Sequence, residues 1–184
     1  MKRLVLASAS PRRREICEKL GLVFDVIPAL GEESLDLSKP LSDAVMAVAR
    51  TKAEEVAARY PGQLVLGADT VVAAPDGTVL GKPADREDAC RMLALLSGKR
   101  HRVITGVWLC GSGIAEGFTD EALVDFMPLD SGEIRDYVET GEPLDKAGGY
   151  AVQGRGMRFV KGIQGDFYTV MGLPGARLWA FLKP

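Results

Sequence analysis

Apolar runs alternate with amphipathic segments along the chain, a pattern that is typical of α/β folds. Continuous apolar stretches predict strands over residues 3–8, 22–28, 64–73, 102–110 and 118–126. Helical spacing predicts helices over residues 11–20, 42–60, 85–96 and 130–140, and a short helix after the GLP at 172–174. Ser42 is expected to cap the second of these helices. The stretch 145–174 carries seven glycines and supports no assignment.

A hairpin is expected to begin with the apolar stretch over residues 64–73. The PDG sequence at 75–77 marks a turn, and TVLGK returns as the second arm. With a four-residue loop, Ala73 faces Thr78, and Asp69 lies opposite Lys82. Opposed charges on a hairpin are an ordinary stabilising pair. Asp69, however, interrupts the otherwise apolar LVLGADTVV, and a buried carboxylate needs a partner or a metal.

Three arginines, Arg12, Arg13 and Arg14, occupy the first turn of the helix that Ser10 and Pro11 begin. The helix dipole disfavours each cation there by roughly 0.3–1 kcal/mol, whereas a phosphate bound at the helix start would reverse that sign. Guanidinium groups that simply extend into water are the alternative. The small residues of the preceding ASAS favour a site, because they let a ligand approach the backbone.

A lysine stands on the apolar stripe of the helix over 42–60. The stripe runs through Val45, Val48 and Val56, and Lys52 fills its gap. Such a lysine ordinarily snorkels outward along its own methylenes. The alternative is an ammonium that is directed into a cleft to meet an anion.

The glycine-rich KAGGYAVQGRG at 146–156 is most simply a series of turns. As the alternative, Gln153 could read the edge of a base, because its amide both donates and accepts. Glu32 and Glu33 are typical of a solvated loop, although a carboxylate there could hold a hard divalent cation together with Asp69.

Composition narrows the function classes. A net charge of −2, with 47% hydrophobic and 26% charged residues, excludes the broad basic field of a nucleic-acid or anionic-membrane binder. The three cysteines, Cys17, Cys90 and Cys110, lack metal-ligand spacing and are typical of reduced thiols in a cytosolic protein. No apolar stretch approaches the roughly 20 residues of a membrane span, and the first apolar run is too short for a signal peptide.

Covalent catalysis has little support. His101, the only histidine, follows Lys99 and Arg100 and is expected at the surface. The other candidate site residues are a set of cations, a few carboxylates and the glycine-rich segment at 146–156. Metal-assisted attack of water on a phosphoanhydride is the reaction class that fits these residues best.

Seven segments in order, from residue 6 to residue 174, resemble the Maf family of nucleotide pyrophosphatases: LASASPRRREI, ARTKAEE, LGADTVV, LGKPADREDA, LSGKRHRVITGV, EPLDKAGGYAVQGRG and GDFYTVMGLP. The resemblance covers nearly the whole chain and implies a single domain over residues 1–184. It also implies an α/β fold of the inosine-triphosphate-pyrophosphatase type, in which a twisted mixed sheet and flanking helices form two lobes around a deep cleft.

The resemblance implies hydrolysis of nucleoside triphosphates to the monophosphate and pyrophosphate with Mg²⁺ or Mn²⁺. Asp69 matches the family's catalytic carboxylate, which accepts a proton from the attacking water. Asp69 and Glu33 are expected to bind the metal. Arg13, Lys52 and Lys82 match the cations that grip the triphosphate.

The same resemblance suggests the substrate. Arg12, Thr70 and Gln153 stand where subfamilies differ, and they resemble the dTTP/UTP type rather than the 7-methyl-GTP type, which has Trp, Gln and Glu there. Gln153 could pair with the O4 and N3–H edge of thymine or uracil. Phe167 and Thr169 depart from the more common Tyr and Asn.

The implied partner is a nucleoside triphosphate, with no nucleic acid and no membrane, and the chain is a candidate homodimer in the cytoplasm. The competing hypothesis is a non-enzymatic nucleotide-binding regulator of septum formation, the process from which the family takes its name. Asp69, Lys52 and Lys82 together favour the enzyme, because a regulator has no need of a buried charged trio.

Overall fold

The computed structural model of the chain describes residues 3–31 and 34–183. Its strands are β1 (Leu4–Leu6), β2 (Phe24–Val26), β3 (Leu64–Ala73), β4 (Val79–Leu80), β5 (Arg100–Gly111), β6 (Ile114–Phe126) and β7 (Val160–Gln164). Its α-helices are α1 (Pro11–Lys19), α2 (Leu41–Arg59), α3 (Arg86–Leu96), α4 (Ser131–Glu139), α5 (Phe167–Met171) and α6 (Gly175–Leu182). Three 3₁₀ helices cover Glu142–Asp145, Ala147–Gly149 and Arg155–Phe159.

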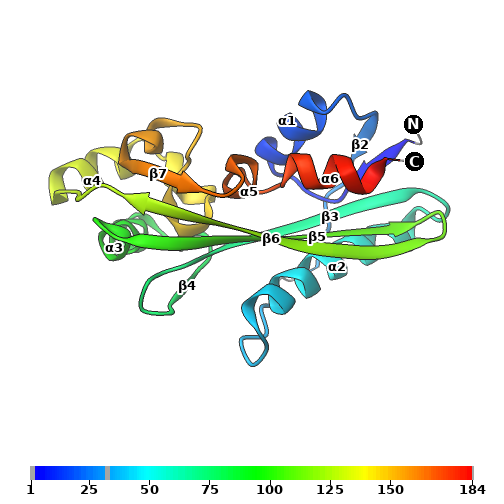
Figure 1. Cartoon of the computed structure of the whole chain (residues 1–184), viewed down its shortest axis with the longest axis horizontal. Coiled ribbons are helices and arrows are strands. Elements are labelled where there is room, and N and C mark those ends of the chain that lie inside the picture. The colour runs from blue at the N-terminus through cyan, green and yellow to red at the C-terminus, as the bar shows by residue number, and fades with distance from the viewer. Residues whose placement is uncertain (1–2, 32–33, 184) are drawn as a thin grey trace. The chain divides into compact units, whose positions relative to one another are not determined.

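The strands form a seven-stranded mixed sheet in the order β2-β1-β3-β5-β6-β7, with β4 paired to β3. Strand β1 runs parallel to both β2 and β3, whereas β4 and β7 run antiparallel to β3 and β6. A two-residue turn with positive φ at Ser112 and Gly113 joins β5 to β6, as the twist of a tight hairpin requires. The expected mixed sheet with flanking helices is therefore confirmed (Figure 1).

The chain divides into two compact units, and three long strands contribute to both. The first unit comprises Met1–Asp69, Thr105–Asp120 and Gly172–Pro184; the second comprises Thr70–Ile104 and Glu121–Met171. Helices α1, α2 and α6 belong to the first unit, and helices α3, α4 and α5 belong to the second. The deep cleft that the resemblance implies stays a prediction.

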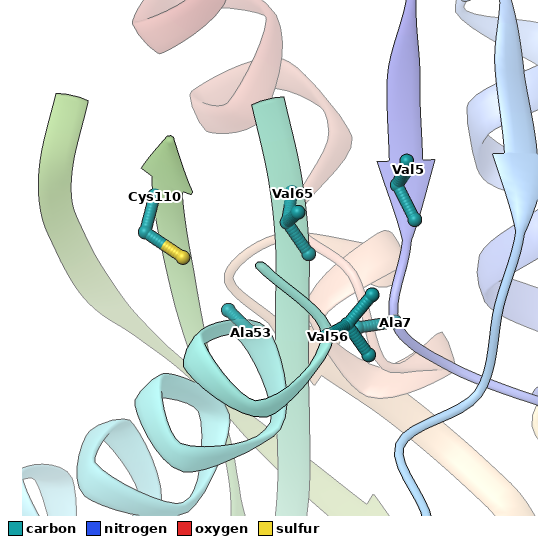
Figure 2. Packing of buried hydrophobic residues seen from close by; sticks show 6 residues of the cluster. All are labelled: Val5, Ala7, Ala53, Val56, Val65 and Cys110. Carbon is teal, nitrogen blue, oxygen red and sulfur yellow. The ribbon is translucent and has the colours of Figure 1, made fainter. Parts of the chain in front are cut away.

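In the first unit, helix α2 covers one face of the strands, and α1 and α6 lie on the other (Figure 1). Figure 2 shows the apolar cluster beneath α2, in which Ala53 and Val56 of the helix lie against strand residues. Those strand residues, Val5, Val65 and Cys110, come from β1, β3 and β5. Because side chains alternate along a strand, every second residue of β3 from Val65 onward faces α2.

Two glycines let α2 approach the sheet backbone directly. A Cβ added at Gly67 would lie 2.3 Å from the carbonyl oxygen of Ala49, and one at Gly106 would lie 2.8 Å from the backbone of Met46. Neither position accepts a side chain without moving the helix. The two glycines therefore fix which turn of α2 lies over β3 and which lies over β5.

The predicted elements agree closely with the structure where the apolar pattern is regular. Strand β3 has the predicted bounds, and helices α1 to α4 differ from them by a residue or so at either end. Ser42 is not the cap of α2, because the helix begins at Leu41 after Pro40. Strand β7 and helix α5 lie in the glycine-rich stretch for which the pattern gave no assignment. No helix within residues 3–31 and 34–183 is both long and apolar enough to cross a membrane.

Candidate active site

Lys52 and Asp69 form a buried ion pair in the first unit. Lys52 Nζ donates a hydrogen bond to Asp69 Oδ1 at 2.7 Å, and the two side chains are only 11% and 12% exposed. Removing two charges from water costs several kcal/mol per ion, so a buried pair in an apolar strand is poor evidence of a purely stabilising role. A buried charged pair of this kind marks a candidate functional site.

The local sequence explains why the two groups meet. Asp69 lies on the same face of β3 as Val65 and Gly67, and this face contacts α2. The backbone of Gly67 lies against Ala49 and Ala53, so the helical turn that carries Lys52 lies over the end of this strand. Of the two expectations for Lys52, outward snorkelling is therefore wrong. Its ammonium is buried against a carboxylate.

Arg13 donates hydrogen bonds to two segments of the first unit, one just before α1 and one just before α6. Its Nε donates to the carbonyl oxygen of Gly172 at 2.8 Å, and its Nη1 donates to Ser8 Oγ at 3.1 Å. Ser10 occupies the N-cap position as predicted, but its side chain caps nothing; its own N–H donates to Ser8 Oγ at 3.2 Å. A half-buried guanidinium thus stands at the helix start.

The other two arginines differ in their surroundings. Arg14 is exposed and its Nε donates to Glu18 one turn later, at 2.8 Å, which is an ordinary surface pair. Arg12 is half-buried, like Arg13. Extension of all three guanidinium groups into water therefore does not describe this helix start, and Arg12 and Arg13 remain candidates for anion binding.

The hairpin register differs from the prediction by one residue. Ala73 pairs with Val79 rather than with Thr78, and the ladder ends at Leu80. Ala74 N–H donates to the carbonyl oxygen of Thr78 at 2.8 Å, so the turn comprises the three residues 75–77, of which Gly77 has a left-handed φ of +88°. The predicted pairing of Asp69 across from Lys82 is wrong, since Lys82 follows the last paired residue and is exposed.

Three expected site residues belong to the second unit. Thr70 follows Asp69 in β3 and is half-buried, whereas Lys82 and Gln153 lie in loops and are exposed. Their approach to Asp69 stays a prediction. Glu33, like Glu32, lies outside the described residues.

His101 is buried, so the prediction of a surface histidine is wrong. The residue is 1% exposed, and its Nε2 lies 2.8 Å from the hydroxyl oxygen of Tyr150. Phe126 packs edge-on against its ring, with 4.8 Å between centroids. Burial lowers the pKa of His101 to about 4, and the nearby charge of Asp125 opposes this shift. His101 is thus a neutral core residue of the second unit.

The predicted metal site has few protein ligands among the side chains that the structure describes. Within residues 3–31 and 34–183, no group of three or more His, Cys, Asp or Glu side chains could hold a metal ion. The carboxylate of Asp69 has two oxygens, of which Oδ1 accepts from Lys52. The donor chemistry fits a hard cation that takes one or two carboxylates and completes its shell with phosphate and water oxygens.

The chain is similar to known proteins over nearly its whole length. The sequence matches the family described as "Maf-like protein" over residues 3–184. The dTTP/UTP pyrophosphatase of Koribacter versatilis is 47% identical over 180 residues, which cover 98% of this chain and 93% of that protein. The dTTP/UTP pyrophosphatase of Bacillus velezensis is 46% identical over 182 residues, which cover 99% and 96%. Among solved structures, the Ham1 protein of Staphylococcus aureus is similar with a TM-score of 0.43 and 13% identity, over 68% of this chain and 72% of that one.

Proposed function

Since the chain belongs to the Maf family, we propose that it hydrolyses dTTP and UTP to the nucleoside monophosphate and pyrophosphate. The relatives named for this activity match over nearly the full length of the chain. The observation that carries the proposal is the buried contact between Lys52 and Asp69, at 2.7 Å.

Asp69 is the proposed general base. A carboxylate can accept the proton of a water molecule that attacks a phosphoanhydride, and Lys52 holds this carboxylate in one orientation. The same ammonium brings a positive charge to the place where the substrate carries several negative ones. Positive charge fixed in advance stabilises the charge that develops in phosphoryl transfer.

Arg13, Lys52 and Lys82 are the proposed ligands of the phosphates, together with the N-terminus of α1. Arg13 is already oriented by its bonds to Ser8 and Gly172. A guanidinium that is oriented before binding loses less freedom when it takes up a phosphate oxygen. The positive end of the α1 dipole lies at the same place and favours an anion there.

Mg²⁺ or Mn²⁺ is the proposed cofactor. Asp69 would hold it together with Glu33, and oxygens of the substrate would complete the shell. When bound, such an ion neutralises phosphate charge and polarises the phosphoanhydride. The residues of the chain bind the substrate, orient it and accept the proton.

The nucleobase of the substrate is proposed to contact Gln153, and Arg12 and Thr70 are proposed to shape the same end of the site. An amide can donate to O4 and accept from N3–H of thymine or uracil, which a carboxylate cannot do.

We propose further that residues 1–184 act as one domain, as a candidate homodimer. A cytoplasmic location is supported by Cys17, Cys90 and Cys110, all of which are free thiols.

Pyrophosphate release from dTTP, UTP, GTP and 7-methyl-GTP, measured with Mn²⁺ or Mg²⁺, tests the proposal. We expect turnover of dTTP and UTP and a loss of about 100-fold or more in kcat for Asp69→Asn. Asp43→Asn, on the exposed side of α2, is the matched control and should retain activity. Nucleotide binding that persists in Asp69→Asn would show that the variant is folded. A wild-type chain that binds dTTP without releasing pyrophosphate would instead support the regulator of septum formation.

A further inference from the structure

The loop Ala151–Gly156, which presents Gln153, is held at both ends by two side chains of the second unit. Gln153 itself is exposed in the middle of the loop. Within the loop, the N–H of Gly154 donates a backbone hydrogen bond to the carbonyl oxygen of Ala151 at 3.2 Å. The conformation therefore depends on groups outside the loop.

Tyr137 of α4 holds the first end. Its side chain is fully buried, and its ring packs edge-on against Phe159 with 5.0 Å between centroids. The hydroxyl accepts a hydrogen bond from the N–H of Ala151 at 3.0 Å and donates to Glu142 Oε1 at 2.8 Å. One hydroxyl thus connects the start of the loop to a carboxylate.

Glu142 holds the second end. Its Oε2 accepts from the N–H of Arg155 and its Oε1 from the N–H of Gly156, each at 3.1 Å. A Cβ added at Gly154 would lie 2.6 Å from Oε1, so the carboxylate lies directly against the loop backbone. Partial burial opposes ionisation, but the hydrogen bonds from Arg155, Tyr137 and Gly156 outweigh it and lower the pKa of Glu142.

This arrangement exceeds what packing alone requires. Phenylalanine and leucine could fill the same space, but they would leave the N–H groups of Ala151, Arg155 and Gly156 without these acceptors. A polar network in which every member is bonded fixes one conformation of the segment it contacts. Here the fixed segment is the loop that bears Gln153.

We propose that Glu142 and Tyr137 are positioning residues that orient Gln153 toward the base of the substrate, an inference that rests on the proposed function. The two side chains touch neither the phosphates nor the attacking water in this proposal. They act on selectivity, because a loop free to move presents the Gln153 amide at variable angles to the base edge. Discrimination by hydrogen bonds requires that both donor and acceptor be held in place.

The test compares Tyr137→Phe and Glu142→Gln with Glu139→Gln, a control on the exposed side of α4 whose wild-type carboxylate pairs with Arg86. We expect the ratio of kcat/KM for dTTP to that for GTP to fall about tenfold in each positioning variant, the equivalent of one or two lost hydrogen bonds. The loss should appear mainly in the KM for dTTP, with kcat reduced less than about threefold. The control should keep the wild-type ratio.

A second measurement separates positioning from general destabilisation. In a Gln153→Ala background, Glu142→Gln should cause no further loss of discrimination, because the oriented group is already absent. Equal losses for dTTP and GTP, or an additive loss in the double variant, would overturn the inference. A wild-type chain that hydrolyses neither nucleotide would instead contradict the proposed function itself.

Discussion

Gly67 lies so close to Ala49 that a Cβ on Gly67 would come within 2.3 Å of the Ala49 carbonyl oxygen. This contact joins α2 to β3 at the helical turn before Lys52. It explains how a ten-residue strand and a long helix, distant in sequence, place a lysine and an aspartate within hydrogen-bond distance. The approach of the two backbones is thus part of the candidate active site.

Gly67→Ala is expected to displace α2, because the atom it meets is backbone and cannot rotate away. Forcing one methyl group into such a contact costs about 1–3 kcal/mol. We expect the free energy of unfolding, measured in urea, to fall by that amount, and pyrophosphate release to fall with it as Lys52 moves away from Asp69. Gly162→Ala in β7 is the control, since a Cβ there meets nothing within 4 Å. Equal stability of the two variants would contradict the proposed contact.

Removal of one member of the ion pair should cost more than removal of both. Lys52→Met leaves the Asp69 carboxylate buried without its cation, and we expect a loss of about 3–5 kcal/mol in the free energy of unfolding. Replacing both residues with apolar ones should recover much of that loss. A double-mutant cycle in urea unfolding measures the coupling.

The exposed pair of Arg3 with Asp25, at 2.6 Å, is the control for that cycle. Its side chains are 63% and 44% exposed, so its coupling should stay under about 1 kcal/mol. If the buried pair of Lys52 with Asp69 gave no larger coupling, the buried contact would be contradicted.

His101 should make the stability of the protein depend on pH. Burial holds the pKa of the folded imidazole at about 4, whereas in the unfolded chain it is near 6.5. Between these values the unfolded state binds more protons, so the free energy of unfolding falls as the pH drops through this window and is unaffected by this group above it. The full effect by pH 4 is about 3 kcal/mol.

Carboxylates also titrate at low pH, so His101→Gln is needed as the reference. A glutamine can still bond to the hydroxyl of Tyr150 but carries no proton equilibrium. We expect the difference in free energy of unfolding between wild type and His101→Gln to shift in favour of the variant as the pH falls from 7 to 4.5. Parallel pH profiles would show that the histidine is not buried.

The alternation of side chains along β5 could have predicted that His101 is buried. Arg100 and Arg102 point outward and pair with Asp125 and Glu121 on β6, so the residue between them must point inward. The neighbouring charges suggested a surface residue, but the period of the strand decides the direction of each side chain. A strand that starts two residues earlier than predicted carries this histidine into the core.

The remaining parts of the site depended on contacts that a linear pattern does not contain. The break in the apolar stripe identified Lys52, and the polar residue in an apolar strand identified Asp69. Their pairing, however, required Gly67. The roles of Tyr137 and Glu142 depend on hydrogen bonds to the backbone of a glycine-rich segment. No periodicity predicts such bonds, because the segment follows neither the helical nor the strand repeat.

The last prediction concerns the choice of nucleotide. Exchanging Arg12, Thr70 and Gln153 for Trp, Gln and Glu should reduce kcat/KM for dTTP by about 100-fold and raise it for 7-methyl-GTP. The reason is clearest at Gln153→Glu, because a carboxylate only accepts and loses the N–H that meets O4 of the pyrimidine. Steady-state kinetics on both nucleotides measures the change.

The Gln153→Glu variant alone should retain part of the effect, and Lys161→Gln, exposed on β7, serves as the matched surface control. An unchanged nucleotide preference in the triple variant would contradict the assignment and place the nucleobase at another part of the chain. A triple variant that loses both activities and also unfolds at a lower urea concentration would have lost stability, and the single Gln153→Glu variant would then decide the question.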